Sequence, residues 1–342
     1  MNRRSDNKVK VLLVAVLVVV AAGVGVWAVV SMRSSGESRT RRPHVDRVDP
    51  GLLTWRQVLA FDTGLSLPSA LTVAGETICV AGDRTLVTFA PDGKRIARQA
   101  LGGEVSCLAV GRDNRILVGL DGRIVSFDRD ARTADITPPG KKPPYLTAIL
   151  WTPESLYAAD SINGVVWRTH DGGATWSAID GRAGDGSPGF VLRSQNFDLA
   201  AGRDGLLRIV NPGMLRVEVY TPDGMRLFTR GDTELTIGHF AGCCNPAHIA
   251  IAPDGSLVTA EKGLTPAKVK VFAPAGGDLP VGTLESVVVE ASQFRNPLVR
   301  LDVAVDAGGR VVVLELERGG QVRLFERKTT RATAAPERKD DE

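Results

Sequence analysis

The segment from His239 to His248 gathers the residue types best suited to chemistry. It holds half of the four cysteines and half of the four histidines of the chain, with Cys243 and Cys244 adjacent and a histidine four residues to either side. Thiolate and imidazole suit copper or zinc, and neighbouring thiols can also cycle through a strained vicinal disulfide. The spacing matches no standard zinc motif. A metal or redox site formed by these four side chains therefore competes with a purely structural turn at the mouth of a channel.

A second group consists of polar residues, each of which stands at the end of an apolar run. Asn211, Glu261 and Glu315 each stand six positions after the glycine of a turn, and less regular copies end at Asp83, Asp121 and Asp160. Two interpretations are open. In the first, the repeated residue forms a turn hydrogen bond in every unit; in the second, the six residues form an acidic ring that binds a cation or a basic ligand. The expected binding residues are Cys243, Cys244, Asn245, Pro246, Glu261, Lys262, Asn211 and Asp160.

A third motif has a structural role. Thr169, Asp171, Gly173, Thr175 and Trp176 match the Asp-box pattern Ser/Thr-x-Asp-x-Gly-x-Thr-Trp, which occurs in sialidases and other propellers. We expect Asp171 to accept hydrogen bonds in the turn and Trp176 to pack between sheets. A single copy, without a recognisable arginine triad for a sugar carboxylate, argues against a sialidase.

The elements that position these residues are short strands in a repeat. An aromatic residue and a proline-containing turn follow the alternating runs TLVTF, LRVEVY and KVKVF, and six units of about 44 residues recur between residues 65 and 328. This length is typical of a four-stranded propeller blade and predicts an all-β, six-bladed β-propeller. The last unit has three strands, and strand 53–61 supplies its fourth, which removes the exposed edges of an open sheet. A two-sheet sandwich, the structural alternative, would not need this period. The expected units are 66–101, 102–141, 145–182, 188–232, 243–292 and 297–328.

With the repeat in place, LYAADSINGVVWRTHDG resembles the repeat of NHL propellers, and the likeness covers residues 53 to 328. The chain also resembles uncharacterised membrane-anchored bacterial NHL-type proteins in which a Gly-Cys-Cys-Asn-Pro segment precedes Thr-Ala/Ser-Glu-Lys-Gly. The resemblance implies the fold and a membrane location, and it implies no reaction.

The amino-terminal region predicts a membrane anchor. Residues 11–30 are uncharged and span about 30 Å as a helix, so we expect an uncleaved signal anchor rather than a cleaved signal or a core helix. Residues 1–10 form a short basic tail, 31–50 a flexible linker, 51–328 the propeller and 329–342 a disordered tail. We place the propeller on the periplasmic side of a bacterial inner membrane, although positive charges flank both ends of the span. The net charge of +3 arises from the first fifty residues, which makes a nucleic-acid partner unexpected.

Three functions follow from these patterns. The first is a non-catalytic module that binds a protein or a small ligand at a propeller face. The second is a redox or metal-handling accessory that uses Cys243 and Cys244. The third is a metal-dependent, lactonase-like hydrolase with Glu261, Asn211 and Asp160 as ligands. We favour the first because the sequence shows neither a nucleophile with its base nor a histidine dyad. A metal ion is the one cofactor considered.

Overall fold

The computed structural model describes residues 48–128, 131–184, 186–230, 238–242, 244–262, 267–274, 283–296 and 298–328. The expected anchor 11–30, most of the linker, the tail 329–342 and Cys243 lie outside these ranges. Within them, no helix has the length and apolar character needed to cross a membrane.

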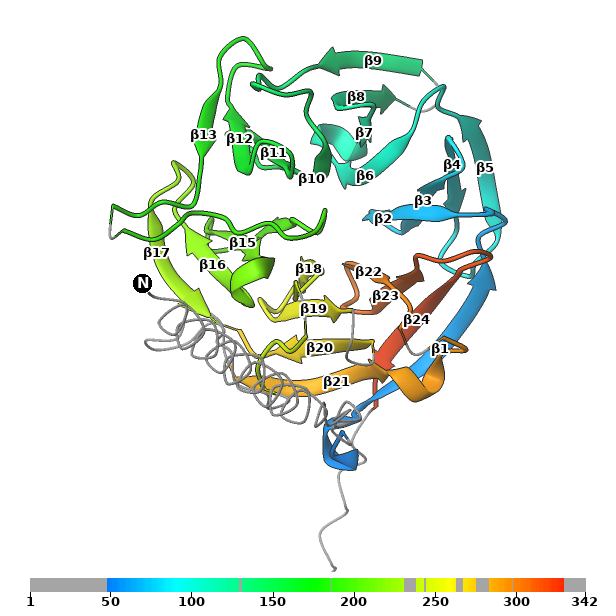
Figure 1. The fold of residues 1–342 in the computed structure, drawn as a ribbon. Helices are drawn as coiled ribbons and strands as arrows, with labels where there is room; N and C mark the ends of the chain where they lie inside the picture. Colours follow the sequence, from blue (N-terminus) through cyan, green and yellow to red (C-terminus); the bar gives the residue numbers. More distant parts are fainter. Residues whose placement is uncertain are drawn as a thin grey trace, which may run out of the picture. The chain divides into compact units, whose positions relative to one another are not determined.

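Six four-stranded antiparallel sheets form a ring (Figure 1), so the predicted six-bladed propeller is confirmed. The first sheet contains β2 (Pro68–Ala74), β3 (Thr77–Gly82), β4 (Thr85–Phe89) and β5 (Arg95–Ala100). The second contains β6 (Val105–Val110), β7 (Ile116–Leu120), β8 (Arg123–Asp128) and β9 (Ala131–Ile136). The third contains β10 (Leu146–Trp151), β11 (Leu156–Asp160), β12 (Val165–Thr169) and β13 (Ser177–Ile179).

The other three sheets complete the ring. The fourth contains β14 (Leu199–Ala201), β15 (Leu207–Asn211), β16 (Arg216–Tyr220) and β17 (Arg226–Arg230). The fifth contains β18 (His248–Ile251), β19 (Leu257–Glu261), β20 (Lys268–Phe272) and β21 (Leu284–Glu290). The sixth contains β22 (Leu301–Val305), β23 (Val311–Glu315), β24 (Gln321–Arg327) and β1 (Trp55–Asp62). Short 3₁₀ turns are η1 (Pro50–Leu52), η2 (Arg112–Asn114), η3 (Pro212–Met214) and η4 (Ala291–Gln293).

The ring closes where the two ends of the folded region meet. β1 pairs antiparallel with β24, from Trp55 opposite Arg327 to Asp62 opposite Gln321. In Figure 1 the first strand, in blue, therefore lies beside the last, in red. This pairing gives the sixth sheet its fourth strand and satisfies backbone groups that an open edge would leave to solvent.

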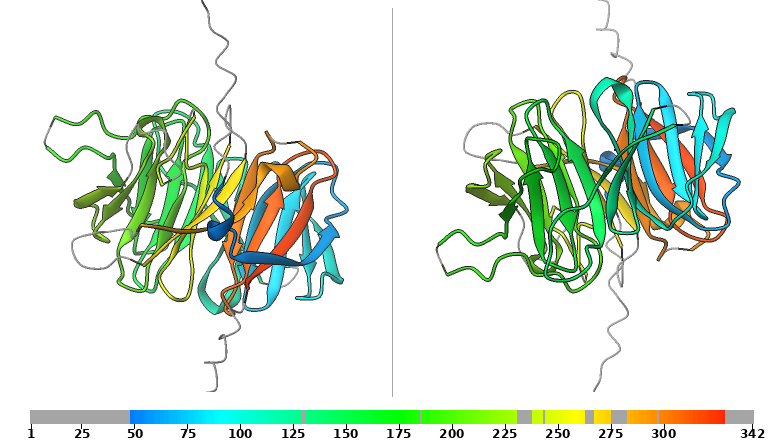
Figure 2. Two further views of the ribbon diagram at one scale, coloured as in Figure 1. Left: turned by 90° about the horizontal axis from the view of Figure 1, so that it is seen from below. Right: turned by 90° about the horizontal axis from the view of Figure 1, so that it is seen from above.

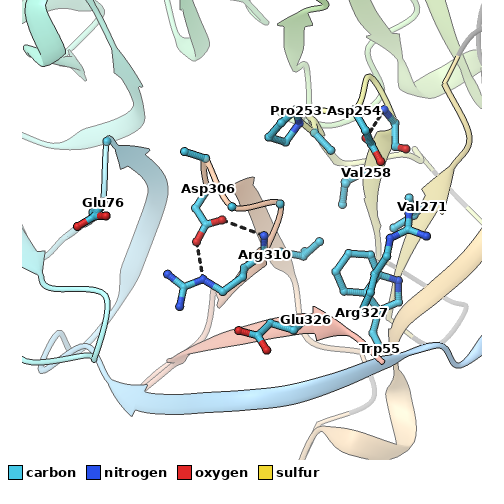
Figure 3. Close-up of a pocket in the computed structure, with 17 residues that line it drawn as sticks. Trp55, Glu76, Pro253, Asp254, Val258, Val271, Asp306, Arg310, Glu326 and Arg327 are labelled. Carbon is cyan, nitrogen blue, oxygen red and sulfur yellow. Dashed lines mark hydrogen bonds and ion pairs between the residues drawn. The ribbon is translucent and has the colours of Figure 1, made fainter. Parts of the chain in front are cut away.

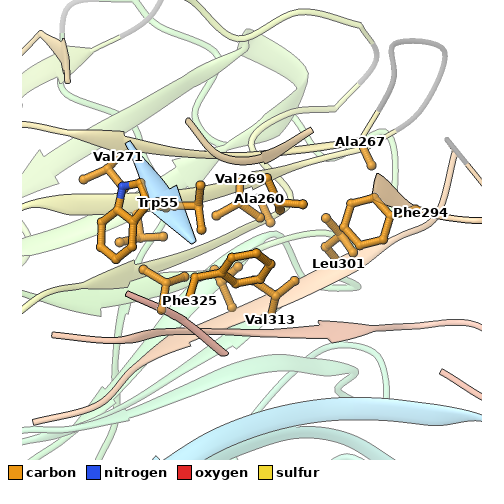
Figure 4. Packing of buried hydrophobic residues seen from close by; sticks show 14 of the residues in the cluster. Trp55, Ala260, Ala267, Val269, Val271, Phe294, Leu301, Val313 and Phe325 are labelled. Carbon is orange, nitrogen blue, oxygen red and sulfur yellow. The ribbon is translucent and has the colours of Figure 1, made fainter. Parts of the chain in front are cut away.

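The core lies between neighbouring sheets. Every residue of β11, β15, β19 and β23 is buried, because each of these second strands has a sheet packed against both of its faces. The largest cluster joins the fifth and sixth sheets, where Val269 and Val271 meet Val313 and Phe325 (Figure 4). Burial of such side chains contributes about 1.5–3 kcal/mol each.

Because successive strands of each sheet are antiparallel, the turns lie on two opposite faces of the ring. Figure 2 shows the ring from its edge in two views. The turn between the first and second strands of each sheet, such as residues 252–256, lies on one face, here called the hairpin face. The turn between the second and third strands and the link to the next sheet lie on the other, here called the connection face. The innermost strands β2, β6, β10, β14, β18 and β22 surround the central channel (Figure 1).

Candidate functional site

The central channel contains a cavity of 280 Å³ lined by residues of all six innermost strands. Aliphatic residues such as Leu71 and Leu108 alternate along its walls with hydroxyl-bearing residues such as Ser106. Three ionisable side chains also line it: Asp198, His248 and Asp302. They come from the fourth, fifth and sixth sheets, at the end of the channel nearest the connection face.

These three side chains are in contact. Nδ1 of His248 lies 3.5 Å from Oδ2 of Asp198 and 3.4 Å from Oδ1 of Asp302. The imidazole is thus held between two carboxylates from neighbouring blades. None of the described residues bonds to Nε2, the other ring nitrogen, and the side chain is 20% exposed where it lines the channel.

Both carboxylates are fixed by the backbone. Asp198 accepts hydrogen bonds of 2.8 Å from the N–H groups of Leu199 and Ile249. Asp302 accepts bonds of the same length from the N–H groups of Val303 and Leu71. Each aspartate therefore joins its own strand to the innermost strand of the next sheet, and its position is set before any ligand arrives.

The electrostatics favour a protonated histidine. Burial alone would lower the pKa of His248, but the Asp302 and Asp198 carboxylates outweigh burial and raise it, while Lys262 opposes them. Burial also raises the pKa of Asp302, an effect that the neighbouring His248 reduces and the Asp198 charge reinforces. A charged imidazole between two carboxylates compensates half of their combined negative charge.

Hydroxyl and thiol groups of the channel are poor nucleophiles. Ser106 donates a hydrogen bond to the Gly119 carbonyl at 3.3 Å, and Thr147 donates one to the Phe197 carbonyl. Burial raises the pKa of the Cys107 thiol to about 12, so it stays protonated at neutral pH. Acid–base chemistry and ligand binding are therefore the functions that this site supports, and nucleophilic catalysis by these groups is not.

The repeated polar residues lie apart from the channel lining. Asp160 is buried and accepts hydrogen bonds from the N–H groups of Tyr145 and Ile162. Asn211 is also buried, accepts from the N–H of Val191 at 2.9 Å and donates to the Gly189 carbonyl at 3.1 Å. Both side chains tie the end of a second strand to the link that leads into the innermost strand.

Glu261 has a different partner. It forms a 2.5 Å ion pair with Lys270, and both residues are about 1% exposed. Nζ of Lys270 also donates to the His239 carbonyl at 2.9 Å and lies 5.9 Å from the centre of the Phe240 ring. Burial raises the pKa of Glu261, although Lys270 and Lys268 act in the opposite direction.

The described part of the Gly-Cys-Cys-Asn-Pro segment is organised by Asn245. Its side-chain amide donates to the carbonyls of Ala241 and Lys262, at 2.5 and 2.8 Å, and its oxygen accepts from the Lys262 N–H. Cys244 and Pro246 are buried, whereas His239 is only partly buried. His248 is the one expected site residue of this segment that lines the channel. Cys243 lies outside the described residues, so the redox hypothesis stays a prediction.

The three ligands expected for a lactonase-like metal site lie apart from one another. Among the described residues, no group of three His, Cys, Asp or Glu side chains is arranged to hold one. Asp160, Asn211 and Glu261 belong to three separate sheets, and each is occupied by the bonds given above.

The turn after β12 has the bonds expected of its motif. Oγ1 of Thr169 donates to Asp171, which also accepts from the Thr175 N–H at 2.9 Å. Hydrogen bonds from Thr175 and Thr169 hold the pKa of Asp171 well below its ordinary value. Nε1 of Trp176 donates to the Gly173 carbonyl at 3.0 Å, and a Cβ on Gly173 would lie 2.3 Å from Ile136. These contacts stabilise the hairpin between β12 and β13.

Asp198 and Asp302 were missed by the sequence analysis, although a signal for them exists. Asp198, His248 and Asp302 each stand seven positions before the glycine of the following turn, in the runs FDLAAGRDG, AHIAIAPDG and LDVAVDAGG. Aligning the first strand of each repeat would have placed all three at one level of the channel.

Comparisons with known proteins support the propeller fold but identify no family for the chain. No protein family model matches the chain, and no curated protein matches it. Streptogramin B lyase is 13% identical, with a TM-score of 0.55 over 81% of this chain and 100% of that one. A gluconolactonase from Xanthomonas campestris is 12% identical, with a TM-score of 0.56 over 78% and 88%. A catalytically inactive histidine-to-alanine variant of Staphylococcus aureus virginiamycin B lyase, solved with quinupristin, is 14% identical, with a TM-score of 0.50 over 81% and 90%.

Proposed function

We propose that this protein is a small-molecule-binding propeller whose ligand enters the connection-face end of the central channel. The observation that carries the proposal is His248, held through Nδ1 between Asp198 and Asp302 with Nε2 left for a ligand. A protonated imidazole in this setting donates a hydrogen bond from Nε2. The ligand therefore carries an acceptor such as a carbonyl oxygen.

The lining of the channel restricts the ligand further. Asp198, His248 and Asp302 place ionisable groups on the fourth to sixth sheets, while the first three sheets contribute the uncharged residues Ala70, Cys107 and Ala148 at corresponding positions. An amphipathic ligand would place its acceptor toward the fourth to sixth sheets and its apolar side toward the first three. A cavity of 280 Å³ lies at the small end of the range for ligand pockets, which favours a compact molecule.

A compact lactone, δ-valerolactone, tests this proposal by calorimetry and by ¹⁵N-histidine NMR on the full chain in detergent. We expect His248→Gln to weaken binding by about tenfold or more, since it removes a charged hydrogen-bond donor. His170→Gln is the matched control, because His170 is exposed in the turn after β12. Equal binding by the two variants, or no lactone-dependent change in the His248 signals, would refute the proposal.

The second candidate is acid–base catalysis on a cyclic ester in the same channel. A histidine oriented by carboxylates is a common general acid or base, and the structural neighbours include a gluconolactonase and a streptogramin lyase with an inactive histidine variant. Gluconolactone is the substrate to assay. Turnover that falls by about 100-fold or more in His248→Gln would establish the enzyme, whereas lactone binding without turnover would leave a binding module.

We also propose that the propeller is tethered to a membrane through residues 11–30 and faces the periplasm. The twenty-residue uncharged run supports this location.

A further inference from the structure

A second cavity lies on the hairpin face, and none of its lining residues belongs to the central channel. Its volume is 740 Å³, and it is enclosed by the fifth and sixth sheets together with the first hairpin of the ring. Figure 3 shows Asp254 and Val258 on one side, Asp306 and Arg310 in the middle, and Glu76 on the far side. The channel function does not use this cavity.

The charges that line this cavity are unevenly compensated. Four carboxylates and two guanidinium groups line it, a net charge of −2. Arg310 is paired with Asp306 at 2.6 Å, and Arg327 is paired with Glu285 through both guanidinium nitrogens. Each arginine is therefore already paired with a carboxylate, which leaves no uncompensated positive charge for an anionic ligand.

Excess negative charge is concentrated at Asp254. The carboxylates of Glu285 and Asp254 both raise the pKa of Arg327, which places two negative groups around one positive group. Within the described part of the chain, the Asp254 side chain accepts one hydrogen bond, from the Ser256 N–H at 2.9 Å, and this bond leaves acceptor capacity on the carboxylate. One more positive group at this place would balance the charge.

A buried hydroxyl next to Asp254 indicates a ligand independently of the charge. Ser256 is 1% exposed, and its Oγ has no hydrogen-bond partner among the described residues. Ser256 precedes β19 by one residue, so its side chain points to the same side as Val258, toward the cavity that both residues line. Unpartnered buried hydroxyls are uncommon because their desolvation costs free energy.

The remaining walls suit an apolar body. Val258, Val271 and Val311 line the cavity, and Trp55 forms an edge with Arg327 stacked 5.1 Å from its ring centre (Figure 3). A compact metal ion does not fit, since no three acidic or other metal-binding side chains of the described residues are grouped to hold one. The carboxylates are instead spread around a cavity of the size that takes an organic molecule.

We propose that this cavity binds an organic cation, a primary ammonium group carried on an apolar body. The ammonium donates hydrogen bonds to Asp254 and to Oγ of Ser256, and the apolar body packs on the valines of the fifth and sixth sheets. The same chemistry is offered by a free amine and by a lysine side chain of a peptide.

The test uses benzylammonium and neutral benzyl alcohol, titrated into the full chain in detergent by calorimetry. We expect benzylammonium to bind about tenfold or more tightly than the alcohol, and its affinity to fall as salt rises from about 50 to 500 mM. Titration with the peptide acetyl-Ala-Lys-Ala-amide distinguishes the sources: tighter binding than benzylammonium identifies a lysine side chain, and weaker binding identifies a free amine.

A pair of matched variants decides whether Asp254 is responsible. Asp254→Asn and Asp92→Asn make the same substitution in two separate Pro-Asp-Gly turns. In each turn the aspartate accepts one hydrogen bond from the backbone N–H two residues later. Asparagine keeps that bond, so both variants are expected to fold. Asp254→Asn should weaken benzylammonium binding by about fivefold or more, and Asp92→Asn should leave it unchanged. Equal affinities in the two variants, or equal affinities for benzylammonium and benzyl alcohol, would overturn the proposal. His248→Gln should not alter this binding.

Discussion

At the residue scale, the buried ionisable groups of this propeller fall into two kinds. His248 faces a cavity and retains an available nitrogen, whereas Glu261 and Lys270 are buried and form an ion pair with each other. The first arrangement can respond to a ligand and to pH. The residues of the second line neither of the two cavities described above, and their clearest expected effect is on stability.

The histidine makes stability depend on pH. Its pKa in the folded protein is raised above the ordinary value of 6.5, so folding favours the protonated ring. The stabilisation is complete below pH 6.5 and is lost as the pH rises through the folded pKa. Urea unfolding at a series of pH values should therefore show a fall in the free energy of unfolding above pH 6.5. His248→Gln should lose this fall while His170→Gln keeps it; the same slope in both variants would contradict the assignment.

The buried ion pair predicts non-additive substitutions. Lys270→Met leaves Glu261 without its nearest partner and should cost about 3 kcal/mol of unfolding free energy, reduced somewhat by Lys268. The double variant Lys270→Met with Glu261→Gln should recover most of that loss, because no unpaired charge remains. Urea denaturation of both single variants and the double variant measures the coupling, and additive losses would show that the pair does not interact as described.

At the element scale, the strand that closes the ring also anchors it. Trp55 at the start of β1 is 7% exposed and donates from Nε1 to Oγ of Ser286 at 2.9 Å. It packs in the cluster between the fifth and sixth sheets (Figure 4). One side chain thus joins β1, β21 and β24, which lie far apart along the chain.

Replacing Trp55 by alanine should lower the stability of the fold more than replacing Trp176 by alanine. Trp55→Ala removes the ring packing, the Ser286 bond and the Arg327 contact, with an expected loss of about 3–5 kcal/mol. Trp176→Ala removes a half-buried ring from one hairpin and should cost less. Thermal denaturation compares the two, and an equal or smaller effect of Trp55→Ala would argue against closure as the main source of stability.

At the scale of the whole molecule, the two faces of the ring separate the proposed sites. The proposed channel site lies near the connection face, and the proposed cation site lies on the hairpin face. Strands β18 and β22 line the channel, whereas the hairpins that follow them line the second cavity. The same repeat therefore contributes to both proposed sites.

The proposed tether predicts where the chain is found in a bacterial cell. The full chain should remain in the membrane fraction after carbonate extraction, because residues 11–30 are uncharged and long enough to span. A chain that begins at residue 48 should be water-soluble and melt at the same temperature, since the described propeller starts there. Release of the full chain by carbonate would contradict the tether.

The repeat alone determined the architecture of this protein. Six similar units, each with alternating apolar residues and a glycine turn, cannot bury their faces singly, so the periodic sequence requires a closed ring of sheets. The run 53–61 was recognised as a strand because the last unit lacked one. These features are local or periodic, and a sequence displays both directly.

Only the tertiary structure decided the sites. Asp198, His248 and Asp302 are about fifty residues apart along the chain, and the packing of three successive sheets around the channel brings them within contact distance. Conversely, Asp160, Asn211 and Glu261 looked like a converging ring, but each is turned into its own blade and bonded there. The position of a residue within the repeat determines how far along its strand it lies. The packing of neighbouring sheets determines whether its side chain faces the channel or is enclosed within its own blade.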